Sequence, residues 1–546
     1  MYVEKAIKTV LVSQKTKTEN AADLLTLKKA VLKMAGRIGL MNLLKDVIKR
    51  ENTIFETAQK ALIKAPLKIA DDDMEIRNIL SLDGYANIEN AKADMDKVLI
   101  EGSAVFCILY TGPEDQIGSF ESKVNFQHWL EVEGAAEEMD VFHDCCLGEM
   151  EYKLMGNRDV EISALLDVSM ILTNLAEEEV VVNVEGPQQV ETKRNKNAIA
   201  FIKDSKQSKV YLKEDFRIPQ NMPTVKEVLF KKAYAMVKNV MIEDGKIIVE
   251  GDVRIFIVYH STDKNAKVQY LCESIPFGEM IMSDGFVDAK YAYATASVEN
   301  IESVVAFETD DIITVNVTLN ICAIGYDEKE YDLIEDLYSR SNDLELKVCC
   351  VQNMRKKFIG CCKNIIRIGH TLKNTDKDVA RVLYAYACPR ISMVKPHPDR
   401  VVIEGIMDTT ICYTTKDAGM HSIKAKLPFN LECQIEGVNK QSNLDVNANV
   451  EYVVVEGSGK ELDIKYSVEV RVDEICKNNL CLVKEIEDKG PLEQAKRGII
   501  VYTADDEESY WDIAKKFRVP QNNIIVGEKD ASKDKPKYGE KIMIIA

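Results

Sequence analysis

The stretch VLIEGSAVFCILY at residues 98–110 decides the fold, because the chain repeats it twice more. IIVEGDVRIFIVY occupies residues 247–259, and VVIEGIMDTTICY occupies residues 401–413. The three runs start 149 and then 154 positions apart. A repeat of this length indicates whole domains and not the short units of a solenoid.

Each run keeps the same neighbours on both sides. A leucine that ends an IRNIL-like segment stands 17 positions before the basic residue that opens each run: Leu80, Leu229 and Leu383. A phenylalanine stands 16 to 18 positions after the tyrosine that closes each run: Phe126, Phe277 and Phe429. Because all three copies hold these spacings, we read them as one domain in triplicate. We expect each IRNIL-like segment to be a short helix that enters its domain.

The runs themselves have the composition of half-buried strands. They are rich in Val, Ile, Thr, Tyr and Phe. A glycine inside each strand, at 102, 251 and 405, costs stability unless a bulge or a close backbone approach requires it. The sequence therefore predicts a mainly β fold of three tandem sandwich-like or barrel-like repeat domains. We place these domains at residues 65–180, 208–345 and 358–488, with a helical segment before them and a small βααβ domain after them.

Composition excludes several classes of function. The 546 residues carry a formal net charge of −18, which repels nucleic acid and anionic lipid. No window reaches the ~20 apolar residues that span a bilayer, and the first residues are too rich in lysine for a secretory signal. We therefore expect a cytoplasmic protein that has no membrane span and does not bind nucleic acid.

Neither the repeated acids nor the cysteines indicate catalysis or a metal. Glu101, Glu250 and Glu404 recur in the runs, but no copy carries a partner acid or histidine at a matching place, as acid–base catalysis requires. The 14 cysteines include three adjacent pairs, whose side chains point to opposite faces of a strand. We expect reduced, mostly buried thiols, and a protein without catalytic residues, cofactor or metal.

The first 64 residues differ from the rest of the chain. The first 60 residues hold 12 Lys or Arg against 6 Asp or Glu. From Asn20 to Arg50 apolar residues recur at helical spacing: Leu24, Leu27, Val31, Met34, Ile38 and Met41. We expect this basic segment, 1–64, to be helical. It either packs on the first β domain or pairs with a partner helix.

The last 49 residues, 498–546, read as a separate small domain. Ser509 is placed to cap a helix that carries Trp511, a second short helix would begin near Gln521, and Tyr538-Gly539 turns into a last strand. The segments SYWDIAKKF, VPQNNI and YGEKIMI resemble a LysM domain. The resemblance implies a ligand-binding groove at two loops, here Glu507, Glu508, Ser509, Tyr510 and Glu528. Two departures stand in that groove, because Glu507 to Ser509 replace the family's G-D-T turn and Glu528 replaces its usual asparagine.

Three β domains of this kind followed by one LysM domain resemble the SipL family of spore-coat morphogenetic proteins, whose repeats are called SPOCS domains. Segments such as IRNIL with KVLIEG and VKEVL with KIIVEG carry the resemblance. It implies a non-enzymatic adaptor in the mother-cell cytoplasm, at the forespore surface, whose LysM domain binds the ATPase of the coat's basement layer. Other coat proteins are further possible partners. The alternative is a protein that binds peptidoglycan or a lipid-linked glycan through the LysM domain.

Overall fold

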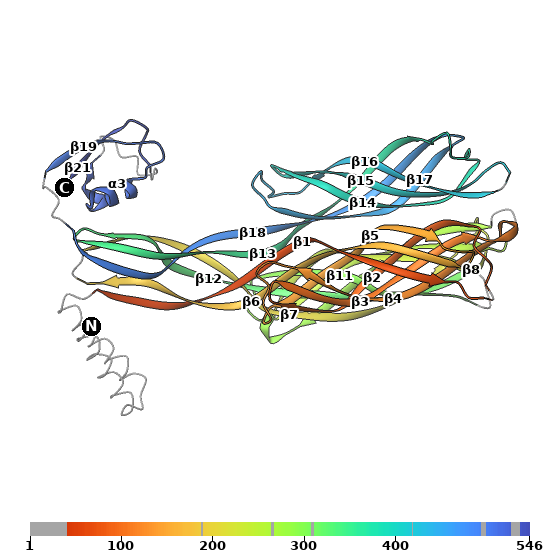
Figure 1. The fold of residues 1–546 in the computed structure, drawn as a ribbon, viewed down its shortest axis with the longest axis horizontal. Coiled ribbons are helices and arrows are strands. Elements are labelled where there is room, and N and C mark those ends of the chain that lie inside the picture. The colour runs from red at the N-terminus through yellow and green to blue at the C-terminus, as the bar shows by residue number, and fades with distance from the viewer. Residues whose placement is uncertain are drawn as a thin grey trace, which may run out of the picture.

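The computed structural model describes residues 41–71, 73–186, 189–263, 267–306, 311–417, 419–492, 498–525 and 535–546. Over these ranges the chain is mainly antiparallel β-sheet, as the sequence predicts (Figure 1). Three six-stranded repeats follow one another, and a small unit with one α-helix ends the chain. Repeat one comprises strands β1–β6, repeat two comprises β7–β12, and repeat three comprises β13–β18.

Every repeat consists of two three-stranded sheets with the same strand order. In repeat one, β2, β3 and β4 form a meander, and β6 lies between β1 and β5 in the other sheet. The two sheets meet along β2 and β5 and along β1 and β4, so each repeat is a flattened barrel. The bounds in repeat one are β1 (Asn42–Lys68), β2 (Asn78–Asp94), β3 (Lys97–Thr111), β4 (Ile117–Glu131), β5 (Asp140–Leu154) and β6 (Asp159–Glu185).

Repeats two and three have the same order. Repeat two has β7 (Val190–Arg217), β8 (Val225–Glu243), β9 (Lys246–Ser261), β10 (Val268–Met282), β11 (Tyr291–Val305) and β12 (Ile312–Ser339). Repeat three has β13 (Asn342–Thr371), β14 (Arg381–His397), β15 (Arg400–Thr414), β16 (Met420–Gln434), β17 (Leu444–Ser458) and β18 (Glu461–Pro491). The 3-10 turns η1 (Pro113–Asp115) and η2 (Asp284–Phe286) lie in loops.

The recurrent glycine stands opposite a bulge in the neighbouring strand, which confirms that a close approach requires it. A Cβ on Gly102 would lie 2.1 Å from the carbonyl oxygen of Asn87 and 2.9 Å from the ring of Phe126. Glycines 251 and 405 face the same kind of carbonyl at 2.1 and 2.2 Å, and each is covered by the phenylalanine of its own repeat. The glycine and the phenylalanine in the sequence pattern are therefore one packing unit.

The tyrosine that closes each run ties the meander to the segment before it. Its hydroxyl donates a hydrogen bond to a backbone carbonyl 36 residues upstream: Tyr110 to Met74 (3.2 Å), Tyr259 to Pro223 (3.0 Å) and Tyr413 to Lys377 (3.1 Å). This tie fixes the entry of β2, β8 and β14.

The IRNIL-like segments lie in or lead directly into strands, so the prediction of a short helix is wrong. Leu80, Leu229 and Leu383 lie in β2, β8 and β14, and each stands at a bulge. In repeat one, Ile79 belongs to the core of its own repeat, whereas Leu80 belongs to a cluster shared by all three repeats. Because both faces of the strand are buried, its apolar residues do not alternate, and the pattern looks helical.

The helix expected from Asn20 to Arg50, within the segment 1–64, is wrong where the structure describes it. Residues 42–64 lie in β1, which pairs with β6 along its whole length. Ile48 is fully buried and its neighbour Val47 is half exposed, as in a strand. Pairing with a distant strand has overridden the local pattern. Residues 1–40, with most of that apolar seam, lie outside the described residues.

The long strands extend beyond the barrels and form a stalk (Figure 1). It consists of the antiparallel pairs β1/β6, β7/β12 and β13/β18, each formed by the first and last strand of a repeat. The first strand of each pair begins before residues 65, 208 and 358, where the sequence predicts that the domains begin. One buried cluster of the stalk draws on all three pairs: Ile48, Val180, Ile199, Leu333, Leu480 and Leu482. The three repeats therefore share one stalk and are not separate domains joined only by linkers.

The barrels also share a core, which we call the junction. It contains buried residues from the meander of every repeat, at matching positions of β3, β9 and β15: Leu109, Val258 and Cys412. Three more matching residues are Ile117, Val268 and Met420. Apolar residues on the outer face of each meander are thus buried by the other two repeats.

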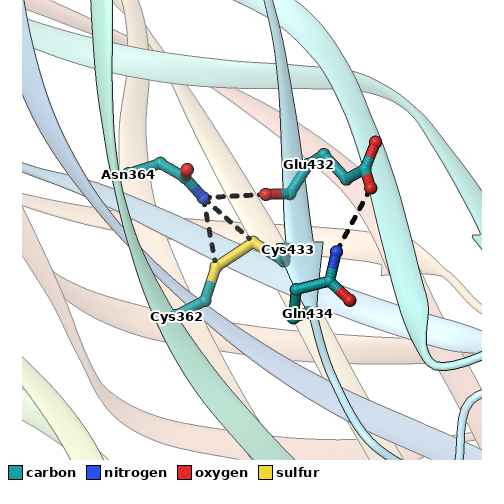
Figure 2. The surroundings of a disulfide bond; sticks show 5 residues. All are labelled: Cys362, Asn364, Glu432, Cys433 and Gln434. Carbon is teal, nitrogen blue, oxygen red and sulfur yellow. Dashed lines mark hydrogen bonds between the residues drawn. A yellow bond between two sulfur atoms is a disulfide. The ribbon is translucent and has the colours of Figure 1, made fainter.

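One pair of cysteines departs from the expected reduced state. Cys362 on β13 and Cys433 on β16 are joined by a disulfide, with Cα atoms 5.8 Å apart (Figure 2). The amide of Asn364 donates to the carbonyl of Glu432 at 3.0 Å and lies beside both sulfurs (Figure 2). The reduced-thiol expectation rested on compartment alone, whereas the fold brings these two strands together where the sheets of repeat three meet. Cys361 points the other way, toward the carbonyl of Val237, as expected for adjacent cysteines on a strand.

Candidate functional site

The C-terminal unit, residues 498–525 and 535–546, holds the residues that the sequence analysis assigned to partner binding. It consists of β19 (Ile499–Thr503), α3 (Tyr510–Phe517), the 3-10 turn η3 (Gln521–Asn523), β20 (Ile524–Ile525) and β21 (Lys541–Ile545). The second helix expected near Gln521 is this single 3-10 turn. Trp511 is buried, with 8% of its surface exposed, among Ile513, Ile542 and Ile544.

The loop before α3 is built around Glu508. Its carboxylate accepts hydrogen bonds from the Tyr502 hydroxyl (2.7 Å) and the Asp505 amide (3.2 Å), and it pairs with Lys516 (3.1 Å). The bond from Tyr502, more than any other contact, holds the pKa of Glu508 below its usual value. Glu508 is therefore occupied inside the unit and does not offer a free charge.

The other predicted residues divide between the core and the surface. Ser509 caps α3 in a reciprocal capping box with Asp512, and Tyr510 is buried. Glu507 is exposed and has a φ of 72°, a conformation that favours glycine. Glu528 lies outside the described residues. The loop thus presents Asp505, Asp506 and Glu507 to solvent.

The outer face of the C-terminal sheet is apolar, which the sequence analysis missed. Ile499 and Val501 on β19 are 69% and 66% exposed, although their side chains are aliphatic. Three further exposed aliphatic residues complete what we call the outer face: Ile525, Met543 and Ile545. Register pairs Ile499 with Ile545 and Val501 with Met543, so the side chains are contiguous. Solvent-facing strand positions are normally polar. The available signal was that residues 499–501 and 543–545 are apolar at every position and do not alternate with polar residues.

The opposite side of the unit, α3, is docked on the stalk. Asp336 of β12 accepts a hydrogen bond from the indole Nε1–H of Trp511 at 2.7 Å. The same carboxylate pairs with Lys515 at 2.7 Å. Because both donors come from one face of α3, a single aspartate fixes the helix on β12.

A second set of contacts surrounds this pair. The ring of Tyr338 packs edge-on against Trp511, with centroids 5.0 Å apart, and its hydroxyl donates to the carbonyl of Val519 at 2.6 Å. Arg518 pairs with Asp343 of β13 at 3.2 Å. The C-terminal unit is therefore held at the tip of the stalk with its outer face turned away from α3.

Charged residues are also buried where the repeats meet. Lys232 of β8 contacts both carboxylate oxygens of Asp83 on β2 at 3.0 Å, and its ammonium lies 5.9 Å from the ring of Tyr386 on β14. These three residues occupy the same position of their repeats, three after the bulged leucine. Burial opposes the charge of Lys232, but Asp83, together with Cys388 and Tyr386, outweighs burial and raises the pKa of the lysine.

Two adjoining cavities of about 290 and 310 Å³ lie beside the junction. All three repeats line the first, which contains Tyr85, Tyr234 and Tyr386. Asp144 lines both, and burial raises the pKa of its carboxyl. Polar contacts across the walls join repeats two and three, such as Tyr293 to Asp473 (3.2 Å) and Arg471 to the Ala294 carbonyl (2.9 Å). These hydrogen bonds hold repeat two against repeat three.

The repeated glutamates make surface hydrogen bonds within their own sheets. Glu101 accepts from Asn90 and Gln127, Glu250 accepts from Asn239, and Glu404 pairs with Lys395. Within the described ranges no group of His, Cys, Asp or Glu is placed to hold a metal ion. No helix of the described part is long and apolar enough to cross a membrane.

Comparison with known proteins matches the repeats. The family model described as SipL, SPOCS domain matches the chain three times, at residues 75–155, 224–306 and 378–457. Each match covers a meander and the strand after it, and leaves the long stalk strands outside. No curated protein and no solved structure matches the chain. The chain is a SipL-like, sporulation-related protein with three SPOCS domains.

Proposed function

We propose that this protein is a non-enzymatic adaptor of spore-coat assembly, which acts in the mother-cell cytoplasm at the forespore surface. Its C-terminal unit, which resembles a LysM domain, binds the ATPase of the coat's basement layer. The exposed outer face of that unit carries the proposal. A contiguous aliphatic surface on a small folded unit is characteristic of a protein–protein contact.

The acidic loop supplies a second element of recognition. Asp506 and Glu507 are exposed and carry like charge, so they suit a basic surface on the partner and favour its approach. Glycan binding is the weaker candidate, because the glutamate at 507 adds a side chain at a left-handed position where the LysM turn has glycine.

The body suits a scaffold. The three barrels share one junction and one stalk. The C-terminal unit therefore projects from a single rigid support and not from a row of independently moving domains. The outer surfaces of the barrels remain available to further coat proteins, and several weak contacts on one support add their affinities.

A binding titration with the full chain tests the proposal. The wild-type protein should bind the purified coat ATPase and should not bind chitin oligomers. Reversal of the loop charges, Asp506→Lys with Glu507→Lys, should weaken ATPase binding roughly tenfold, because two exposed ion pairs contribute about 1 kcal/mol or slightly more.

The matched control is Glu273→Lys, which reverses an exposed charge on β10 of the body. It should leave the affinity unchanged. Tight binding of chitin oligomers with no binding of the ATPase would replace the adaptor with the glycan-binding alternative.

A further inference from the structure

A second pair of cysteines lies face to face in repeat three. Cys350 on β13 and Cys481 on β18 are register partners, and their sulfur atoms are 3.1 Å apart. Both side chains are exposed. Directly opposed residues of an antiparallel pair have Cα atoms about 4.5 or 5.5 Å apart, within the range that a disulfide spans. The backbone is therefore already in place for a bond between them.

The disulfide Cys362–Cys433 and the facing pair Cys350/Cys481 both lie in this repeat. Strand β13 carries Cys362, which is bonded to Cys433 of β16 in the barrel, and twelve residues earlier Cys350, which faces β18 in the stalk. In the first two repeats the positions equivalent to Cys362 and Cys433 hold aliphatic pairs, Ile63 with Leu130 and Leu212 with Ile281.

The stalk shows the same contrast. The four long strands of repeats one and two, β1, β6, β7 and β12, contain a single cysteine, Cys322, whose register partner is Gln207. Repeat three alone has a long pair with sulfur on both strands in register. It is also the repeat whose last strand, β18, leads to the C-terminal unit.

We propose that Cys350 and Cys481 form a thiol–disulfide exchange site, where a low-molecular-weight disulfide oxidises both thiols and gives repeat three its second cross-link. One cysteine thiolate attacks a sulfur of the small disulfide, whose S–S bond breaks and releases one small thiol. The other cysteine then attacks the sulfur of the first cysteine, and the second small thiol leaves. Two electrons pass from the cysteine pair to the small disulfide, and the two cysteine protons end on the released thiols.

The proposed Cys350–Cys481 bond would enclose the Cys362–Cys433 disulfide in sequence. The Cys350–Cys481 bond closes a loop that contains the whole meander of repeat three, including Cys362 and Cys433. Oxidation would thus fasten the two strands of the β13/β18 pair to each other on the same strand, β13, that carries Asp343, the partner of Arg518.

Peptide mapping of the full chain tests the proposal. The reduced protein is treated with oxidised glutathione, its remaining thiols are alkylated, and its proteolytic peptides are analysed by mass spectrometry. We expect a Cys350–Cys481 cross-linked peptide, the loss of both alkylation sites, and two glutathione thiols released for each such bond.

Two variants make the test specific. Cys350→Ser should abolish the cross-link and leave Cys481 as a glutathione adduct, because no partner remains to resolve it. Cys349→Ser should keep the cross-link, because the register partner of Cys349 is Leu482. A lasting glutathione adduct on Cys350 or Cys481 in the wild-type chain, a bond to a different cysteine, or two thiols that remain fully alkylated would each overturn the proposal.

Discussion

Asp83 and Lys232 stand at the same position of two successive repeats, and their side chains meet in an ion pair of 3.0 Å where the repeats join. Tyr386, at that position of the third repeat, lies beside the lysine. Identical copies would place three like residues here. Divergence at this one position therefore gives the repeats a complementary contact and fixes which repeat lies beside which.

The first prediction concerns that pair. Lys232→Met should lower the free energy of unfolding by about 3 kcal/mol, because it leaves the buried carboxylate of Asp83 without its partner. Asp83→Asn should lower it by less, because the Lys232 side chain is 32% exposed. The double variant should recover most of the loss, since no unpaired charge remains. Urea denaturation followed by circular dichroism measures the effect. Additive losses in the double variant would contradict a direct pair.

The second prediction concerns the recurrent glycine. Gly251→Ala should cost about 1 to 3 kcal/mol, because its Cβ would lie 2.1 Å from the carbonyl oxygen of Met236 and 2.7 Å from the ring of Phe277. Gly278→Ala is the control on the adjacent strand, where a Cβ meets nothing within 4 Å. Its urea midpoint should match the wild type. Equal midpoints for both variants would show that the carbonyl of Met236 and the ring of Phe277 move aside without cost.

These glycines show how far the sequence predicts the fold. The need for a close approach at Gly102, and the phenylalanine at a fixed distance, are local consequences of one strand pair, so spacing reveals them. The capping of α3 by Ser509 is likewise local. The mainly β class follows from composition and repetition together.

Long-range contacts account for what the sequence did not predict. Leu80 looks helical because its strand is buried on both sides, once by its own barrel and once by the junction. Residues 42–50 look helical because their strand partner, residues 176–185, lies far along the chain. Nothing near Asp336 in the sequence indicates Trp511 as its partner, because the two residues lie 175 positions apart.

The third prediction concerns the docking of the C-terminal unit. Asp336→Ala removes the acceptor of both Trp511 and Lys515. The bond from Trp511 contributes about 1.5 to 3 kcal/mol, and the more exposed pair with Lys515 contributes about 1 kcal/mol or less. The unit should leave the stalk tip, and small-angle X-ray scattering should show a larger maximum dimension. Asp332→Ala, four residues earlier on β12, removes a partner of Arg194 and makes a matched control with unchanged scattering. An unchanged scattering profile for Asp336→Ala would mean that the contacts of Tyr338 and Arg518 alone hold the C-terminal unit on the stalk.

The fourth prediction concerns the outer face as the contact with the coat ATPase. Val501→Asp places a charge among Ile499, Met543 and Ile545 and should weaken binding by about 2 kcal/mol, roughly 30-fold in Kd. The fold should survive, because Val501 points to solvent and is 66% exposed. Circular dichroism checks the fold, and a titration of the full chain with the ATPase measures Kd.

Thr503→Asp provides the matched control for that titration. Thr503 is exposed on the same face of β19, two residues further on, where its register partner is Lys541 and not an aliphatic residue. A new aspartate there meets a lysine, so binding should change little. Equal weakening by both variants would indicate a general effect of negative charge near the acidic loop. Unchanged binding by Val501→Asp would remove the outer face from the interface and leave the loop of Asp506 and Glu507 as the surface that the partner contacts.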